Sequence, residues 1–226
     1  MRLVYWFTLF SIVLLSACSS RFSLLSRVVD ELQSQAGVTG GDAHIPAKPD
    51  LAYRYLRVDI EGRKTALMVL AFEEAHPNGA IEVWYSAGGQ VIKMQNSRVI
   101  ATSGLDTDWV RVQYSPQAPE WAQLSDQSTH YTRLRDEMPG YHYAVADTLQ
   151  LKAVQGVPAI RLPQSLPPAK ALSYRWFQER SSSTLPLAWY AYGMHRGQMT
   201  VVYSEQCLSA QLCLKLQRWP VQEAPF

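Results

Sequence analysis

The chain has 226 residues, of which 47% are hydrophobic and 18% charged, and its formal net charge is +2. This composition is typical of a packed globular protein and excludes a disordered chain. The basic residues form no block and the sequence shows no repeat, so nucleic acid is not an expected partner.

The N-terminal residues have the pattern of an exported bacterial lipoprotein. Arg2 gives a small positive region, and residues 3–15 are almost entirely apolar. This run is long enough for a signal peptide but shorter than the ~20 residues that a membrane-spanning helix needs. Leu15-Ser16-Ala17-Cys18 resembles the lipobox of bacterial lipoproteins, in which the cysteine thiol takes a diacylglycerol before cleavage. We predict a signal peptide over residues 1–17 and lipidation of Cys18. The alternatives are an uncleaved anchor and a plain secretory signal.

The residue after the cysteine bears on which membrane holds the protein. In lipoproteins of Gram-negative bacteria an Asp there favours retention in the inner membrane, and this chain has Ser19. One acyl chain holds a protein only marginally on a bilayer, but the resemblance to lipoproteins implies three. We therefore expect a lasting lipid anchor in the outer membrane, with the protein facing the periplasm.

Residues 18–50 are expected to form a lipidated tether with a short helix. A helix is predicted over residues 21–36, because apolar side chains recur there at helical spacing. These side chains are Leu24, Leu25, Val28 and Leu32. The narrow apolar stripe favours docking on the domain, and lying on the membrane is the alternative.

From residue 51 onward the apolar residues recur with a period of two, which is typical of β-strands. The pairs Asn78-Gly79, Gly88-Gly89 and Asn96-Ser97 predict turns. Residues 115–139 are less regular, and we expect a long excursion there, with brief strands as the alternative. The predicted strands cover residues 53–58, 65–72, 81–85, 91–95, 98–102, 141–154, 172–176, 187–192, 199–203 and 212–219. We predict an all-β domain over residues 51–226, an antiparallel meander β-barrel or a barrel-like sandwich, preceded by the N-terminal helix.

Two cysteines remain once Cys18 is assigned to the lipid. Cys207 and Cys213 form an even pair in an oxidising compartment. On one continuous strand they would lie ~20 Å apart and could not bond. We predict a disulfide that closes a short hairpin loop, and two free thiols are the alternative.

The sequence contains no catalytic signature, so we predict no enzymatic site, cofactor or metal site. The five histidines have no partner at ligand spacing. Asp106 and Asp108 follow a turn, where acids more often bind local backbone N–H groups than act in catalysis. With Asp147 and Glu179, they are the candidate acids of an alternative function, a periplasmic enzyme that modifies polysaccharide. That function would need two of them to face each other in a cleft.

The aromatic residues are the better indication of a binding surface. Trp84 and Tyr85 point to opposite faces of one predicted strand, as do Trp189 and Tyr190, and Tyr192 shares a face with Tyr190. An exposed Trp or Tyr ring suits the C–H face of a sugar, because it has an apolar body and a polar edge. We predict glycan or partner contacts at these five residues, with core packing as the alternative for each.

Residues 83–105 carry a family resemblance. Val83-Trp84-Tyr85-Ser86-Ala87-Gly88-Gly89-Gln90 contains a W-x-S-x-x-G pattern, Asn96-Ser97-Arg98 an N-x-R turn, and Thr102-Ser103-Gly104-Leu105 a T-x-G-L ending. With the lipobox, this block resembles the YjbF/GfcB family of group 4 capsule polysaccharide lipoproteins, although Ser97 stands where a Gly is often found. The resemblance implies a β-barrel-like domain on the outer membrane and a role in capsule or exopolysaccharide export and assembly. It implies no catalytic residues.

Of three candidate functions, the first below is the one that we expect, and the other two are alternatives. The first is a non-enzymatic accessory that binds polysaccharide or a polysaccharide-export protein. The second is the polysaccharide-modifying enzyme. The third is a structural lipoprotein that binds an outer-membrane protein through a sheet edge or an aromatic patch.

Overall fold

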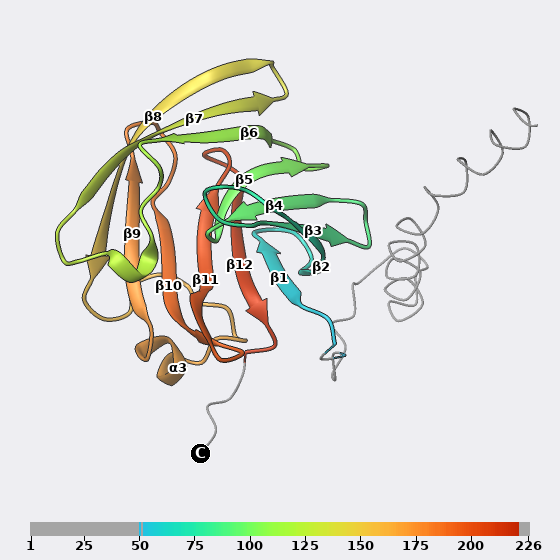
Figure 1. Ribbon diagram of the computed structural model, residues 1–226. Coiled ribbons are helices and arrows are strands. Elements are labelled where there is room, and N and C mark those ends of the chain that lie inside the picture. The colour runs from blue at the N-terminus through green and yellow to red at the C-terminus, as the bar shows by residue number, and fades with distance from the viewer. Residues whose placement is uncertain (1–49, 51, 222–226) are drawn as a thin grey trace, which may run out of the picture. The chain divides into compact units, whose positions relative to one another are not determined.

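The computed structural model describes residue 50 and residues 52–221 as an antiparallel β-sheet with little helix (Figure 1). Cys18 and the helix predicted over residues 21–36 lie outside the described residues. The strands are β1 (Tyr55–Ile60), β2 (Ala66–Glu74), β3 (Ile81–Ser86), β4 (Val91–Gln95), β5 (Arg98–Ser103), β6 (Asp108–Ser115), β7 (Thr129–Met138), β8 (His142–Val154), β9 (Arg175–Ser181), β10 (Ala188–His195), β11 (Gln198–Cys207) and β12 (Cys213–Trp219). The helical turns are η2 (Trp121–Gln123) and α3 (Pro168–Leu172). Neither is long and apolar enough to cross a membrane, and the same holds for any helix in this part of the chain.

The strand order explains why the chain closes into a barrel. Most consecutive strands pair as antiparallel neighbours, and the first strand pairs with the last, with Tyr55 of β1 opposite Trp219 of β12. The 12-stranded sheet therefore begins at β5 and ends at β6, two strands that are consecutive in the chain. These two terminal strands lie next to each other. The predicted antiparallel meander barrel is confirmed, with one junction at which the described residues form no strand ladder.

The interior beside β1–β5 and β12 is filled mostly by apolar side chains, and we call it the apolar half. It also holds a buried ion pair, in which Arg218 of β12 donates to the Glu82 carboxylate of β3 at 2.9 and 3.0 Å. Trp84 of β3 is fully buried there, together with Leu56 and Met68 from the neighbouring strands. Burial of apolar surface is worth roughly 25 cal/mol per Å² and stabilises this half. Its other members are Val58, Ile92, Met94, Val99, Trp109, Leu208, Leu212, Leu214 and Leu216.

The interior beside β7–β11 combines aromatic rings with charged side chains, and we call it the charged half. Trp121 of η2 packs against Tyr190 and Phe177, with ring centroids 4.7 and 5.6 Å apart. The segment between β6 and β7 thus folds inward and contributes to the core. The other buried hydrophobic members are Ala118, Leu124, Tyr131, Leu149, Leu151, Tyr192 and Val201.

An outer layer covers β9–β11. The linker between β8 and β9 places Ala171 and Tyr174 against Trp176, whose Nε1 donates to the Ala171 carbonyl at 2.9 Å. Gly193 is required here, because a Cβ at this position would collide with the Tyr174 ring.

The turn between β4 and β5 has a left-handed backbone at both of its residues. Asn96 has φ 47° and Ser97 has φ 61°, as a type I′ hairpin turn requires. Ser97 holds this conformation without being a glycine. Its hydroxyl accepts a hydrogen bond from Arg218 at 3.4 Å.

Two strands differ from the sequence-based prediction. β7 lies within residues 115–139, which are predicted to be irregular, and β6 is not predicted at all. The inward positions of β7 include Arg133 and Arg135, which are buried, so the apolar alternation that marks a strand is missing. In β6 a bulge between Trp109 and Arg111 interrupts the alternation.

Two boundaries also differ. Leu172 ends α3 instead of beginning a strand, because Pro168 at the first helical position favours a helical turn there. A regular strand over the predicted residues 141–154 would place Tyr141 and Tyr143 on the same face as Leu149, but they are 67% and 70% exposed whereas Leu149 is buried. Ala144 has φ 52° and the β7–β8 register shifts beside it, which changes the side that the following residues face.

Candidate functional site

The junction between β5 and β6, which we call the seam, is closed by side chains. Gln206 reaches across from β11, where its Oε1 accepts from the Val99 N–H and its Nε2 donates to the Ser97 carbonyl, both at 2.9 Å. Buried backbone groups need partners. The amide of Gln206 therefore supplies bonds to β5 that a neighbouring strand would otherwise make.

Asp108 fixes one end of the seam. Its carboxylate accepts from Thr102 Oγ1 at 2.8 Å and from the backbone N–H groups of Gly104 and Leu105 at 3.0 and 3.3 Å. Thr102 Oγ1 in turn accepts from the Trp109 N–H at 3.1 Å. Asp108 thus binds local backbone N–H groups, which is the more common role of an acid after a turn, and does not need a catalytic role to explain its position.

The segment between β6 and β7 fixes the other end. Trp121 Nε1 donates to the Asn96 carbonyl at 2.8 Å, and Asn96 Nδ2 donates to Glu120 Oε1 at 3.0 Å. Arg98 donates to the Pro119 carbonyl at 3.1 Å, and its guanidinium carbon lies 4.0 Å from the Trp121 ring centroid. This cation–π contact ties β5 to the inward-folded segment.

A groove of about 590 Å³ lies along the seam. Residues of β4 and β5 line one side and residues of β6 the other. A second hollow of about 450 Å³ continues it, and the two share Lys93, Ala101 and Val110. We call both together the seam groove. Its lining mixes apolar and hydrogen-bonding side chains, including His76, Gln95, Ile100, Arg111, Gln113 and Leu134.

The charges of the seam groove are largely neutralised in pairs. Lys93 Nζ lies 2.8 Å from Glu74 Oε1, and Arg111 Nη2 lies 2.9 Å from Asp136 Oδ2. The Lys93–Glu74 pair is more than one-third exposed and contributes little energy, so both side chains remain available for hydrogen bonds. Asp136 is buried, but the Arg111 side chain is exposed at the groove. The groove therefore suits an extended ligand that is rich in hydroxyl groups and carries little charge.

A buried ion network occupies the charged half. Arg133 donates from Nη2 and Nε to Asp147 Oδ2 at 2.7 and 3.0 Å, and Arg135 also binds this oxygen. Arg133 Nη1 lies 3.9 Å from Glu179 Oε1. Asp147 is fully buried and is the carboxylate that both arginines share, while Arg135 also pairs with Glu137. Removing one member of such a buried network leaves an uncompensated charge.

Glu179 is surrounded by tyrosine hydroxyls. Tyr131 donates to Glu179, and Tyr190 Oη lies 3.5 Å from Glu179 Oε1. Burial, and after it the adjacent Glu179 carboxylate, raises the pKa of Tyr131 and of Tyr190 well above the ordinary value. Both phenols therefore remain protonated donors. The cavity beside Glu179 measures about 10 Å³, far less than a sugar ring occupies.

The four candidate acids are therefore held in structural contacts. Asp147 and Glu179 both lie next to Arg133 in the interior. Asp106 is exposed and pairs with Arg63. Asp108 binds the backbone at the seam.

The predicted aromatic contacts separate into two groups. Trp84, Tyr190 and Tyr192 are 0%, 2% and 8% exposed and pack in the core, as in the alternative that the sequence left open. Tyr85 and Trp189 are half-buried on the opposite faces of their strands, outside the seam groove. For these two, contact with a glycan or a partner stays a prediction.

The predicted disulfide is confirmed. Cys207 and Cys213 are bonded across the β11–β12 hairpin. Next to it, the Leu208 carbonyl accepts from Trp109 Nε1 at 3.0 Å, so this hairpin also contacts the start of β6 at the seam. Within residues 50 and 52–221, no group of three or more His, Cys, Asp or Glu side chains could hold a metal ion.

The seam residues Gln206 and Thr102 are not among the predicted site residues, although Thr102 begins the T-x-G-L ending of the family motif. Gln206 bonds a residue 107 positions away, and no local pattern marks such a contact. For Thr102 the signal was present, because a hydroxyl residue shortly before a Gly and an Asp is typical of a side-chain-bonded turn.

Comparison with known proteins agrees with this fold. The family model described as "Group 4 capsule polysaccharide lipoprotein gfcB, YjbF" matches residues 42–217. The crystal structure of a hypothetical lipoprotein, YmcC from Escherichia coli (K12), is similar with a TM-score of 0.57 and 16% identity, over 93% of this chain and 100% of that one. At this identity the likeness shows the fold alone. No curated protein is similar enough to count as a match. Because the family model spans most of the sequence, the protein belongs to the YjbF family of group 4 capsule polysaccharide lipoproteins.

Proposed function

We propose that this protein is a non-enzymatic accessory of capsule or exopolysaccharide export, anchored by lipid in the outer membrane and facing the periplasm. The observation that carries the proposal is the family match over residues 42–217. The lipobox ending in Cys18 supports the anchor, and Ser19 supports the outer membrane.

The seam groove is the proposed contact site. The seam groove runs along the junction of β5 and β6, so an extended ligand can lie between residues of these two strands. Polysaccharide hydroxyls both donate and accept hydrogen bonds, which matches the amide, imidazole and guanidinium groups of Gln95, Gln113, His76 and Arg111. The apolar side chain of Val110, 55% exposed, offers a surface for sugar C–H groups.

The enzymatic alternative has no comparable support. Its four candidate acids are engaged with arginines or with backbone N–H groups. Two opposed carboxyl groups with space for a sugar between them are the requirement for glycoside hydrolysis, and the small cavity beside Glu179 does not meet it.

Gene deletion and complementation test the proposed function. Deletion should reduce surface or secreted polysaccharide under inducing conditions, and the wild-type gene should restore it. Complementation with Cys18→Ala should leave the protein unlipidated, release it from the membrane fraction and fail to restore the polymer. Normal polymer output after deletion would refute the proposal, and unchanged membrane fractionation of Cys18→Ala would refute the anchor.

A further inference from the structure

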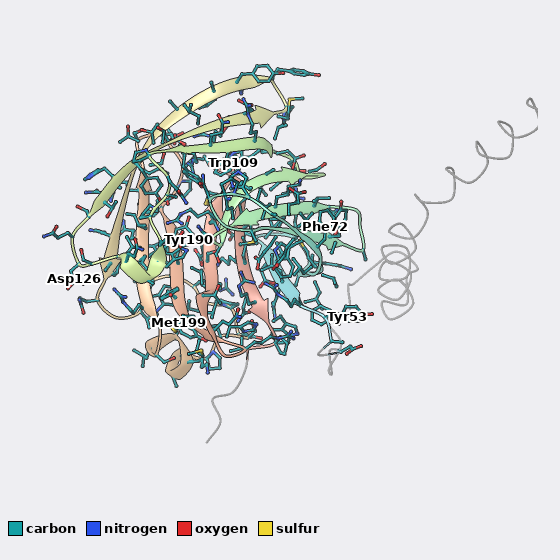
Figure 2. The ribbon with its side chains drawn as sticks, in the orientation of Figure 1. Tyr53, Phe72, Trp109, Asp126, Tyr190 and Met199 are labelled. Carbon is teal, nitrogen blue, oxygen red and sulfur yellow. A yellow bond between two sulfur atoms is a disulfide. The ribbon has the colours of Figure 1, made fainter. Side chains whose placement is uncertain are left out.

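One end of the barrel, which we call the tether end, combines three features. It holds α3, the turn between β10 and β11, and the residues that lead into β1 (Figure 1). Figure 2 shows Met199 at this end. The tip of the β7–β8 hairpin lies at the opposite end of the barrel.

Exposed apolar side chains gather at the tether end. Leu172 of α3 is 69% exposed, and Met194 and Met199 are 55% and 50% exposed. The two methionines are cross-strand partners that flank the β10–β11 turn. Tyr174, just after Leu172, packs directly on the backbone of Gly193 and so holds α3 beside this hairpin.

Basic residues accompany these apolar side chains. Residues 168–175 contain Lys170 and Arg175, residues 194–200 contain Arg196, and neither stretch contains an acidic residue. Apolar side chains flanked by Lys and Arg are typical of surfaces that lie in the headgroup region of a bilayer. Each basic residue adds attraction to anionic lipid.

The chain that leads back to Cys18 leaves the barrel at the same end. Arg196 Nη2 donates to the Tyr53 carbonyl at 3.0 Å, directly before β1. The β10–β11 turn is therefore bonded to the segment through which the lipid anchor is connected to the barrel.

We propose that the tether end rests on the phospholipid leaflet that carries the anchor, with Leu172, Met194 and Met199 in the headgroup region. This inference rests on the proposed lipid anchor. It adds an orientation: the barrel stands on α3 and the β10–β11 turn, and the β7–β8 hairpin with Tyr141 points away from the membrane.

Site-specific labels test the orientation in the full-length, lipidated protein. With Cys18 acylated and Cys207 and Cys213 bonded, Met199→Cys and Tyr141→Cys each supply one free thiol for an environment-sensitive fluorophore. The proteins are reconstituted into vesicles of phosphatidylethanolamine and phosphatidylglycerol that contain spin-labelled lipid. We expect several-fold stronger quenching at position 199 than at position 141. Equal quenching at the two positions would overturn the inference. So would a blue shift at position 199 that is already present without vesicles, because it would indicate a protein partner or a second copy.

A second variant addresses the chemistry of the contact. With the fluorophore at Leu172→Cys, the double substitution Met194→Asp and Met199→Asp should reduce quenching to the level of position 141. Tyr141→Asp is the matched control and should leave the quenching at position 172 unchanged. Circular dichroism verifies the fold of each variant. Pelleting with vesicles measures the anchor separately. Failure to pellet refutes the anchor of the proposed function, whereas pelleting with equal quenching refutes only the orientation.

Discussion

The two halves of the barrel interior are built on different chemistry. In the apolar half, most interior side chains are apolar and pack around Trp84, beside the buried ion pair of Arg218 and Glu82. In the charged half, Arg133, Asp147 and Glu179 occupy the interior. Arg98 of β5 lies 4.0 Å from Glu179, so the ion network extends across the seam. Where the ladder is missing, charged and amide side chains connect the strands in its place.

The largest expected effect comes from removing the centre of the ion network. Asp147→Ala leaves Arg133 and Arg135 buried without their shared carboxylate, which should destabilise the fold by about 3–5 kcal/mol. Urea unfolding measures this loss. Asp106→Ala is the control, because its ion pair with Arg63 is exposed, and it should change stability little. If Asp147→Ala lowered the free energy of unfolding no more than the control, the ion network would not be needed for the stability of the charged half.

An effect of similar size is expected at the seam. Gln206→Leu removes the partners of the Val99 N–H and the Ser97 carbonyl, at about 1–3 kcal/mol for each buried group left unpaired. Hydrogen exchange should accelerate at the Val99 amide. The matched control is Gln217→Leu, equally buried but bonded to Ser165 on the β8–β9 linker, which should leave that amide protected. Unchanged exchange in Gln206→Leu would show that the amide does not replace a ladder.

The disulfide should contribute about 2 kcal/mol, because it closes a short loop. The double substitution Cys207→Ser and Cys213→Ser should lower stability by this amount. It should also alter the fluorescence of Trp109, whose indole donates to the neighbouring Leu208 carbonyl. A loss of stability without a change in Trp109 fluorescence would show that the hairpin does not support the seam.

The smallest effect is a pH dependence that arises from His195, the last residue of β10. Burial, and then Arg218, Arg196 and Arg54, lower the pKa of His195 to about 4. In the unfolded chain the same imidazole has a pKa near 6.5. Between pH 6.5 and about pH 4 the unfolded chain therefore binds more protons than the folded protein, and stability falls as the pH is lowered. His195→Gln should flatten this part of the stability curve. Identical curves of stability against pH for the wild type and the variant would show that His195 is not the source of this pH dependence.

The two halves also differ in how far the sequence predicts them. Alternation of apolar residues identifies β1–β5. It also places Trp84 and Tyr85 on opposite faces of one strand, but it does not show which of the two rings faces the interior. β7 is not predicted because Arg133 and Arg135 occupy inward positions that are apolar in most strands. The paired cysteines predict their disulfide because their number and compartment leave few alternatives. The seam groove has no local signal, since it depends on the tertiary placement of β5 beside β6.

The most direct test of the central claim is polymer output after filling the seam groove. Val110 is exposed on β6 and Ala101 lines the facing side on β5, so Val110→Trp and Ala101→Trp should obstruct the groove from either side. Tyr141→Trp is the control on an exposed hairpin outside the groove. In a deletion strain, with equal membrane levels of each protein, both groove variants should fail to restore surface or secreted polysaccharide, and the control should restore it. Full restoration by both groove variants would show that the seam groove is not the site through which this protein acts.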